Sequence, residues 1–252
     1  MVSIRGRSLF LNLIFMVGFT LTASAAEKPN KGIFEILLAK QADLPAPGPL
    51  ITNMYYRQSQ SLNGKWNVVV DEHEWGDKAM PSTYYDPAPL DGTGMQLREF
   101  AFNERRQLKV PGDWNTQDAT LFRYRGVAWY QRNFDIDKEN NQRYFLHFGG
   151  VNYAANVYLN GKPLTTHKGG YTAFNVEVTA ALQDGSNYLV VRVDGKLGES
   201  TVPTVKTSDF FKYSGITRDV TLVSVPETFI RQYHVYLDDL ANGTVKGWVQ
   251  LD

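Results

Sequence analysis

The sequence predicts an all-β protein, an antiparallel sandwich of jelly-roll type. Short runs rich in β-branched and aromatic residues recur along the chain, turn residues separate them, and no stretch after residue 26 keeps a helical period. Asn160-Gly161 follows one such run and is the strongest hairpin signal, because both residue types tolerate a positive φ. With 252 residues and 43% hydrophobic content, the chain can bury one large core.

A secretory signal peptide is predicted at residues 1–26. Arg5 and Arg7 precede an apolar run at 9–21, and small residues follow at 23–26. The apolar run is too short for a membrane span, so we expect cleavage, no membrane span in the mature chain, and a bacterial protein of the periplasm or cell exterior.

Composition excludes several function classes. Lys+Arg 26 balances Asp+Glu 26, so the chain has no net positive charge and no polybasic segment to attract nucleic acid or an anionic membrane. The chain has no cysteine, so it can form neither a disulfide nor a thiolate site. The four histidines, at 73, 147, 167 and 234, lack the spacing of a metal site, and we expect neither a metal nor another cofactor.

The predicted strands follow an extended leader at residues 27–60, whose segment 44–49 is too proline-rich for a helix or strand. Alternating or β-branched runs then place strands at 62–70, 106–110, 126–134, 143–148, 155–159, 174–178, 188–193 and 220–225. Together they predict one domain over residues 61–225.

Residues 226–252 predict one more hairpin, with strands at 229–237 and 244–251 around Asn242-Gly243. A lone hairpin is marginal, so it either packs on the sandwich or opens a second β domain. Because alternation continues to Asp252, we expect a second domain that is incomplete in this sequence.

The loop at 208–219 carries the strongest functional signal. It joins an acid, aromatic residues, a glycine and an arginine, namely Asp209, Phe210, Phe211, Tyr213, Gly215 and Arg218. Gly215 suits a turn with positive φ, and the five donors of Arg218 can hold loop carbonyls. The phenylalanines are expected to wedge the loop onto the sandwich. Asp209 could bind a ligand or cap its own turn.

Several motifs, in one order, resemble the sugar-binding domain of glycoside hydrolase family 2, and the β-glucuronidase branch is the most similar. The motifs are Val110-Pro111-Gly112-Asp113-Trp114-Asn115, Trp129-Tyr130-Gln131-Arg132, the segments 143–161 and 167–174, and Asp209-Phe210-Phe211-x-Tyr213-x-Gly215-Ile216-x-Arg218. The resemblance implies a galactose-binding-like jelly roll, followed at 226–252 by the first strands of an immunoglobulin-like domain.

The resemblance also implies a function. The parent would be a secreted retaining exo-glycosidase of β-glucuronidase or β-galactosidase type, with both catalytic carboxylates in a barrel outside this chain. In resembling enzymes the loop aspartate reaches the barrel and contacts glycone hydroxyls or a sodium ion, which makes Asp209 the expected substrate-binding residue. Phe210, Phe211, Tyr213, Gly215 and Arg218 would support its loop. Expected partners are the terminal glycone of a carbohydrate, the barrel and, as an open option, further copies of the parent.

The remaining acid pairs and aromatic residues are interpreted as structural and not as catalytic or sugar-binding residues. The acid pairs Glu72/Glu74 and Asp135/Asp137 resemble solvated turn acids, and most large aromatics should be buried. Trp114 and Tyr84-Tyr85 are the aromatics for which exposure is expected. The alternative function is a stand-alone secreted carbohydrate-binding or adhesive module, and whether the sequence is a short protein or a truncated one stays open.

Overall fold

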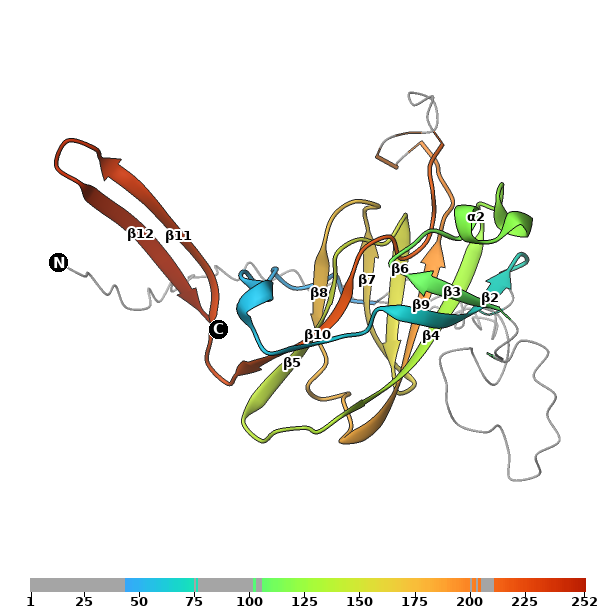
Figure 1. Cartoon of the computed structure of the whole chain (residues 1–252), viewed down its shortest axis with the longest axis horizontal. Helices are drawn as coiled ribbons and strands as arrows, with labels where there is room; N and C mark the ends of the chain where they lie inside the picture. The colour runs from blue at the N-terminus through green and yellow to red at the C-terminus, as the bar shows by residue number, and fades with distance from the viewer. Residues whose placement is uncertain are drawn as a thin grey trace, which may run out of the picture.

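The computed structural model describes residues 44–74, 76, 102, 106–199, 201–202, 204 and 211–252. Two antiparallel sheets pack as a sandwich, and a hairpin projects from it (Figure 1). The predicted all-β antiparallel sandwich is confirmed. The predicted signal segment lies outside the described residues, and within them no helix is long and apolar enough to cross a membrane.

The larger sheet has six strands in the order β3-β2-β4-β9-β6-β7. Their bounds are β2 Gly64–Asp71, β3 Gln107–Val110, β4 Val127–Ile136, β6 Ala154–Leu159, β7 Lys162–Lys168 and β9 Gly185–Asp194. The predicted hairpin joins β6 to β7: Asn160 has φ 52° and Gly161 has φ 78°, which confirms the turn.

The smaller sheet has four strands in the order β1-β10-β5-β8. Their bounds are β1 Ser59–Ser61, β5 Gln142–Phe148, β8 Phe174–Glu177 and β10 Val220–Pro226. The sequence did not predict β1 or β7. Both are edge strands: β1 is the polar triplet Ser-Gln-Ser, and β7 contains Pro163, which a central strand would not tolerate.

Helical structure among the described residues is limited to single turns, namely η1 Met54–Tyr56, α2 Trp114–Gln117 and η3 Ala119–Leu121. Asp113 caps α2 by accepting a hydrogen bond from the N–H of Thr116 at 2.7 Å. The turn directs Trp114 into the core, where it is fully buried and its Nε1 donates to Tyr124 O at 3.1 Å. The expected exposure of Trp114 is therefore wrong, and Tyr84-Tyr85 lies outside the described residues.

The main core lies between the two sheets. In β4, Ala128 and Tyr130 belong to this core, whereas Val127 and Trp129 belong to a second apolar cluster that includes Val190. Alternating residues of β4 therefore enter different clusters, and both sets are buried. This explains why the strand is apolar at almost every position of its first half.

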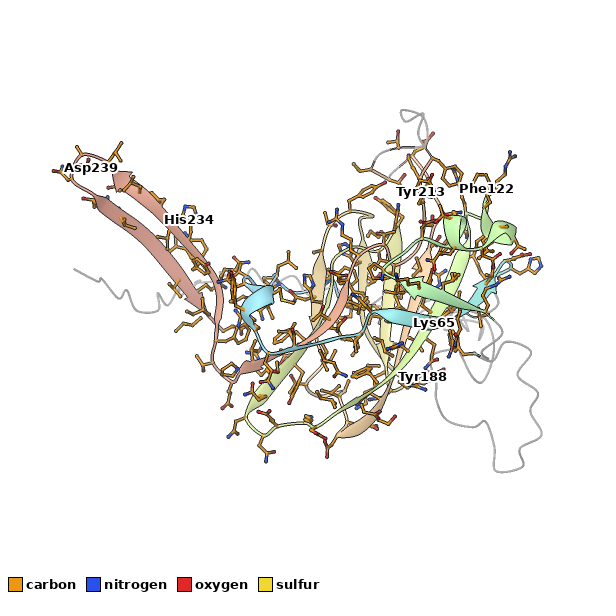
Figure 2. All side chains as sticks on the ribbon, in the orientation of Figure 1. Lys65, Phe122, Tyr188, Tyr213, His234 and Asp239 are labelled. Atoms are coloured by element: carbon orange, nitrogen blue, oxygen red, sulfur yellow. The ribbon has the colours of Figure 1, made fainter. Side chains whose placement is uncertain are left out.

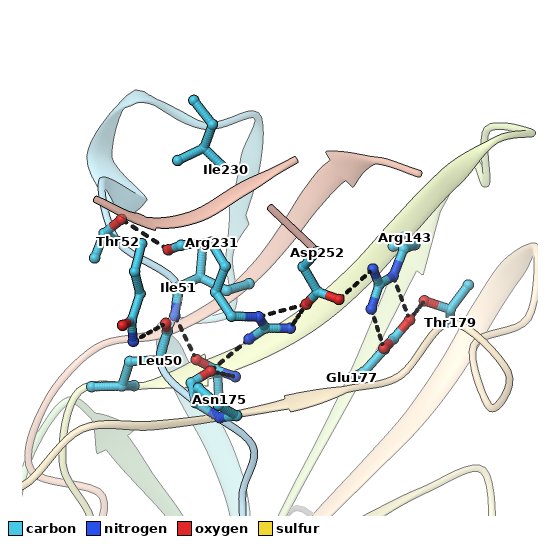
Figure 3. A network of polar contacts seen from close by, with 12 residues as sticks. Leu50, Ile51, Thr52, Arg143, Asn175, Glu177, Thr179, Ile230, Arg231 and Asp252 are labelled. Carbon is cyan, nitrogen blue, oxygen red and sulfur yellow. Dashed lines mark hydrogen bonds and ion pairs between the residues drawn. The ribbon is translucent and has the colours of Figure 1, made fainter. Parts of the chain in front are cut away.

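The projecting hairpin consists of β11 Ile230–Asp239 and β12 Thr244–Leu251. Its base is fixed to the sandwich by the polar network of Figure 3, in which Asp252 accepts hydrogen bonds from Arg231 and from Arg143, the latter at 3.2 Å. Arg143 also donates two hydrogen bonds to Glu177, at 3.0 and 2.8 Å. Beyond its base the hairpin is largely exposed.

Candidate functional site

The segment that precedes β10 contains the loop residues singled out from the sequence. Asp209 and Phe210 lie outside the described residues, so their roles stay predictions. The structure describes residues 211–219, and these include Phe211, Tyr213, Gly215 and Arg218.

Gly215 is the point at which the loop contacts two other segments. Its N–H donates to Asn152 O at 3.0 Å, and its carbonyl accepts from the N–H of Asn152 at 2.9 Å. Its φ is 139°, and a Cβ added there would lie 2.8 Å from Gly112 O. Only glycine satisfies both the backbone angle and the close approach.

Asn115 connects the loop to the segment that follows α2. Its buried Nδ2 donates to Leu121 O, Phe122 O and Tyr124 O at 2.9, 3.1 and 3.0 Å. Its Oδ1 accepts from the N–H of Ser214 at 2.9 Å. The side-chain amide of Asn115 therefore fixes both the segment 121–124 and the loop at Ser214. Its nitrogen must face the three carbonyls while its oxygen faces the N–H of Ser214, so a single orientation of the amide satisfies all four contacts.

Asn152 holds Tyr213, the residue before Ser214 in the loop, because its Nδ2 donates to Tyr213 O at 2.6 Å. Sequence reasoning missed both Asn115 and Asn152 as positioning residues. The available signal was their place in the motifs 110–115 and 143–161, where polar amides stand among aromatic and glycine residues.

The two ordered segments bring an aromatic cluster together, which we call the aromatic shelf: Phe122, Phe211 and Tyr213. Phe122 stacks on Phe211 with ring centroids 5.4 Å apart and an interplanar angle of 17°, and Phe211 meets Tyr213 at 4.8 Å. Figure 2 shows Phe122 and Tyr213 at the same end of the sandwich. Both are largely exposed, at 51% and 43%.

Arg218 lies on another side of the loop. A Cβ at Gly149 would lie 2.9 Å from its Cβ, and its Nη1 donates to Tyr171 O at 3.2 Å. It borders a groove of about 800 Å³ that also includes His147 and Asp219. Burial lowers the pKa of His147, while the charge of Asp219 opposes that shift.

The described acids near the loop have structural partners. Asp113 caps α2, and Asp194 accepts from the N–H of Lys196 at 3.0 Å. Glu74 pairs with Lys196 and, at 3.8 Å, with Arg192, so it is more constrained than the solvated acid that was expected, whereas Asp135 is exposed. Within the described part of the chain, no three His, Asp or Glu side chains are grouped as metal ligands require.

Comparisons with known proteins agree with this arrangement. A family model described as "Glycosyl hydrolases family 2, sugar binding domain" matches residues 59–226. A putative β-glucuronidase of Formosa agariphila is 37% identical over 132 residues, 51% of this chain and 16% of that protein. A β-galactosidase of Thermoanaerobacter pseudethanolicus is 32% identical over 126 residues, 49% of this chain and 17% of that protein.

A solved structure shares the architecture. The β-glucuronidase of Bifidobacterium dentium, complexed with coumarin-3-O-glucuronide, superposes with a TM-score of 0.58 and 27% identity, covering 76% of this chain and 33% of that one. The chain thus spans about a third of that protein, and its matched part spans less than a fifth of the two sequence relatives.

Proposed function

The chain belongs to glycoside hydrolase family 2, and on that premise we propose that it is the sugar-binding portion of a secreted, retaining exo-glycosidase that hydrolyses terminal β-linked glycosides. The observation that carries the proposal is the family match over residues 59–226, which includes every strand of the sandwich and the described loop residues 211–219. Secretion rests on the signal-like pattern of residues 1–26.

A β-glucuronide is the favoured substrate and a β-galactoside the second choice. Support comes from the names of the relatives, two of the three being β-glucuronidases, one of them in complex with a glucuronide. A carboxylate at position 209 would accept hydrogen bonds from adjacent glycone hydroxyls, while the contacts of Asn115 and Asn152 hold the neighbouring loop residues in place.

The two catalytic carboxylates are assigned to a part of the parent enzyme outside these residues. Retaining hydrolysis uses two carboxyl groups about 5–5.5 Å apart on either side of the bond. Among the described acids beside the loop, Asp113 caps a helix and Asp194 accepts from a backbone N–H, whereas Glu74 pairs with Lys196. In this proposal residues 61–225 form the sugar-binding domain and residues 226–252 begin an immunoglobulin-like domain, with the exposed hairpin β11–β12 as its first two strands.

Activity measurements on two proteins test the proposal. The 252-residue chain and a longer product of the same gene are each incubated with 4-nitrophenyl β-D-glucuronide and 4-nitrophenyl β-D-galactoside. We expect no turnover by the chain alone and hydrolysis of the glucuronide by the longer product. Turnover by the chain alone would contradict the assignment of the carboxylates, and an inactive longer product would favour a carbohydrate-binding module.

A further inference from the structure

We propose that the aromatic shelf and two adjacent arginines form a binding site for an anionic sugar residue, next to the proposed glycone site. Arg123 and Arg125 join Phe122 and Phe211 around a hollow of about 430 Å³. The inference deepens the proposed function, on which it rests: it assigns the class of sugar that lies beyond the scissile bond, a uronate or a sulfated sugar.

The ring geometry suits a pyranose. Phe122 and Phe211 are nearly parallel, and Tyr213 tilts against Phe211 at an interplanar angle of 51°. Phe122 and Tyr213 both keep about half of their surface in contact with solvent. The rings form one contiguous cluster, and a contiguous apolar patch marks a binding surface where a single exposed ring does not. The apolar face of a sugar ring matches such rings in size and shape.

The charge of the site selects an anion. Arg123 and Arg125 are both exposed, and neither forms an ion pair with a carboxylate among the described residues, whereas nearby Arg106 pairs with Asp118 at 3.2 Å. The guanidinium of Arg125 lies over the ring of Phe211, 5.3 Å from its centroid, which holds it against the shelf. A planar guanidinium binds carboxylate or sulfate oxygens with paired hydrogen bonds.

The backbone contacts make the site rigid before a ligand arrives. Asn115 binds the carbonyls of Phe122 and Tyr124, and Asn152 binds that of Tyr213, so both sides of the shelf are anchored to the sandwich. A site whose backbone is already held in place loses little conformational entropy on binding. Position 209 lies two residues before Phe211 and four before Tyr213 in the sequence, which links the shelf to the proposed glycone-binding residue.

Binding of two matched tetrasaccharides to the 252-residue chain tests the inference. The probes are the β-1,4-linked tetrasaccharide of glucuronic acid and cellotetraose, which differ only in the carboxylate or hydroxymethyl group on each ring. By NMR titration we expect the uronate to bind roughly 10-fold more tightly, with shifted amides at 122–125 and 211–213 and an affinity that falls as salt is added.

Three variants separate charge, stacking and non-specific attraction. Arg125→Gln should weaken uronate binding roughly 10-fold and leave cellotetraose unchanged, and Phe122→Ala should weaken both probes roughly 3- to 10-fold. Lys162→Gln is the matched control, since it removes an exposed charge in β7, at the far end of β6 from Asn152. It should change neither affinity.

Equal affinity for the two probes, no binding of either, or uronate binding that survives Arg125→Gln would overturn the inference. These outcomes are independent of turnover. A longer gene product that hydrolyses glucuronides while the uronate fails to bind at the shelf would remove this site and leave the proposed function intact. If the uronate binds at the shelf but the longer gene product hydrolyses neither substrate, the binding site stands and the proposed hydrolytic function is removed.

Discussion

The side chain of Asn115 accepts a hydrogen bond from the backbone N–H of Ser214 at 2.9 Å, although 99 residues separate them in sequence. The same amide donates to three carbonyls between residues 121 and 124. The two segments that build the aromatic shelf are therefore joined by one buried side chain, and their relative position depends on it.

Asn115→Asp should destabilise the chain, because a carboxylate cannot donate to the three carbonyls and would be buried beside them. We expect the free energy of unfolding to fall by about 2–3 kcal/mol in urea titrations. Asn141→Asp, at an exposed turn with φ 61°, is the control and should change it by less than about 0.5 kcal/mol. Equal effects of the two changes would rule out a special role for Asn115.

Gly215→Ala should cost about 2 kcal/mol or more, because it combines positive-φ strain with a Cβ that lies 2.8 Å from Gly112 O. Two controls divide these causes. Gly185→Ala has φ 77° with no atom within 4 Å and should cost about 1 kcal/mol, whereas Gly198→Ala meets nothing within 4 Å and should be near neutral. Thermal unfolding of the three variants separates the two causes. If Gly215→Ala lowers the free energy of unfolding no more than Gly185→Ala does, the close approach to Gly112 O is unimportant.

Asp252→Asn should loosen the hairpin base, because Arg231 is 8% exposed and would lose its charged partner. We expect faster hydrogen exchange in β11 and β12 and a loss of about 1–3 kcal/mol. Asp238→Asn is the control within the same hairpin. It disrupts an exposed pair with Lys246 at 2.7 Å, and pairs of this kind contribute less than about 1 kcal/mol. Unchanged exchange in the Asp252 variant would mean that the network does not fix the hairpin.

The Arg143–Glu177 pair predicts an acid-dependent loss of stability. Hydrogen bonds from Arg143 lower the pKa of Glu177 below its usual value of 4.5. A depressed carboxyl pKa adds stability above the unfolded pKa, and that stability disappears as the pH falls through the folded pKa. Between pH 7 and pH 3 the free energy of unfolding should therefore fall more for the wild type than for Glu177→Gln. The difference between the two proteins should be less than about 1 kcal/mol, because the ion pair is partly exposed. Parallel pH profiles in urea titrations would contradict this.

The fold was largely predictable because its central strands carry local signals. The strand-forming run at 126–134 and the Asn160-Gly161 turn each correspond to an element of the structure, although the first half of β4 is buried on both faces and does not alternate. The edge strands β1 and β7 were not predicted, because an edge strand can be polar or contain proline when a single neighbour supplies its hydrogen bonds.

The site was predictable only in part. Gly215 was selected for a positive φ, which the structure has. Asn115 and Asn152 were missed because their partners in the loop are 99 and 61 residues away, and a neutral amide has no periodicity that would indicate such a contact. Arg123 and Arg125 were missed because an arginine without a carboxylate partner is recognised only when its neighbours in space are known.

Replacement of Asp209 in the longer gene product tests the central claim most directly. If this carboxylate binds the glycone, Asp209→Ala should lower kcat/KM for 4-nitrophenyl β-D-glucuronide by roughly 10- to 100-fold, the effect of losing charged hydrogen bonds, and leave Tm unchanged. An unchanged kcat/KM would contradict the claim and make Asp209 a residue that only caps its turn.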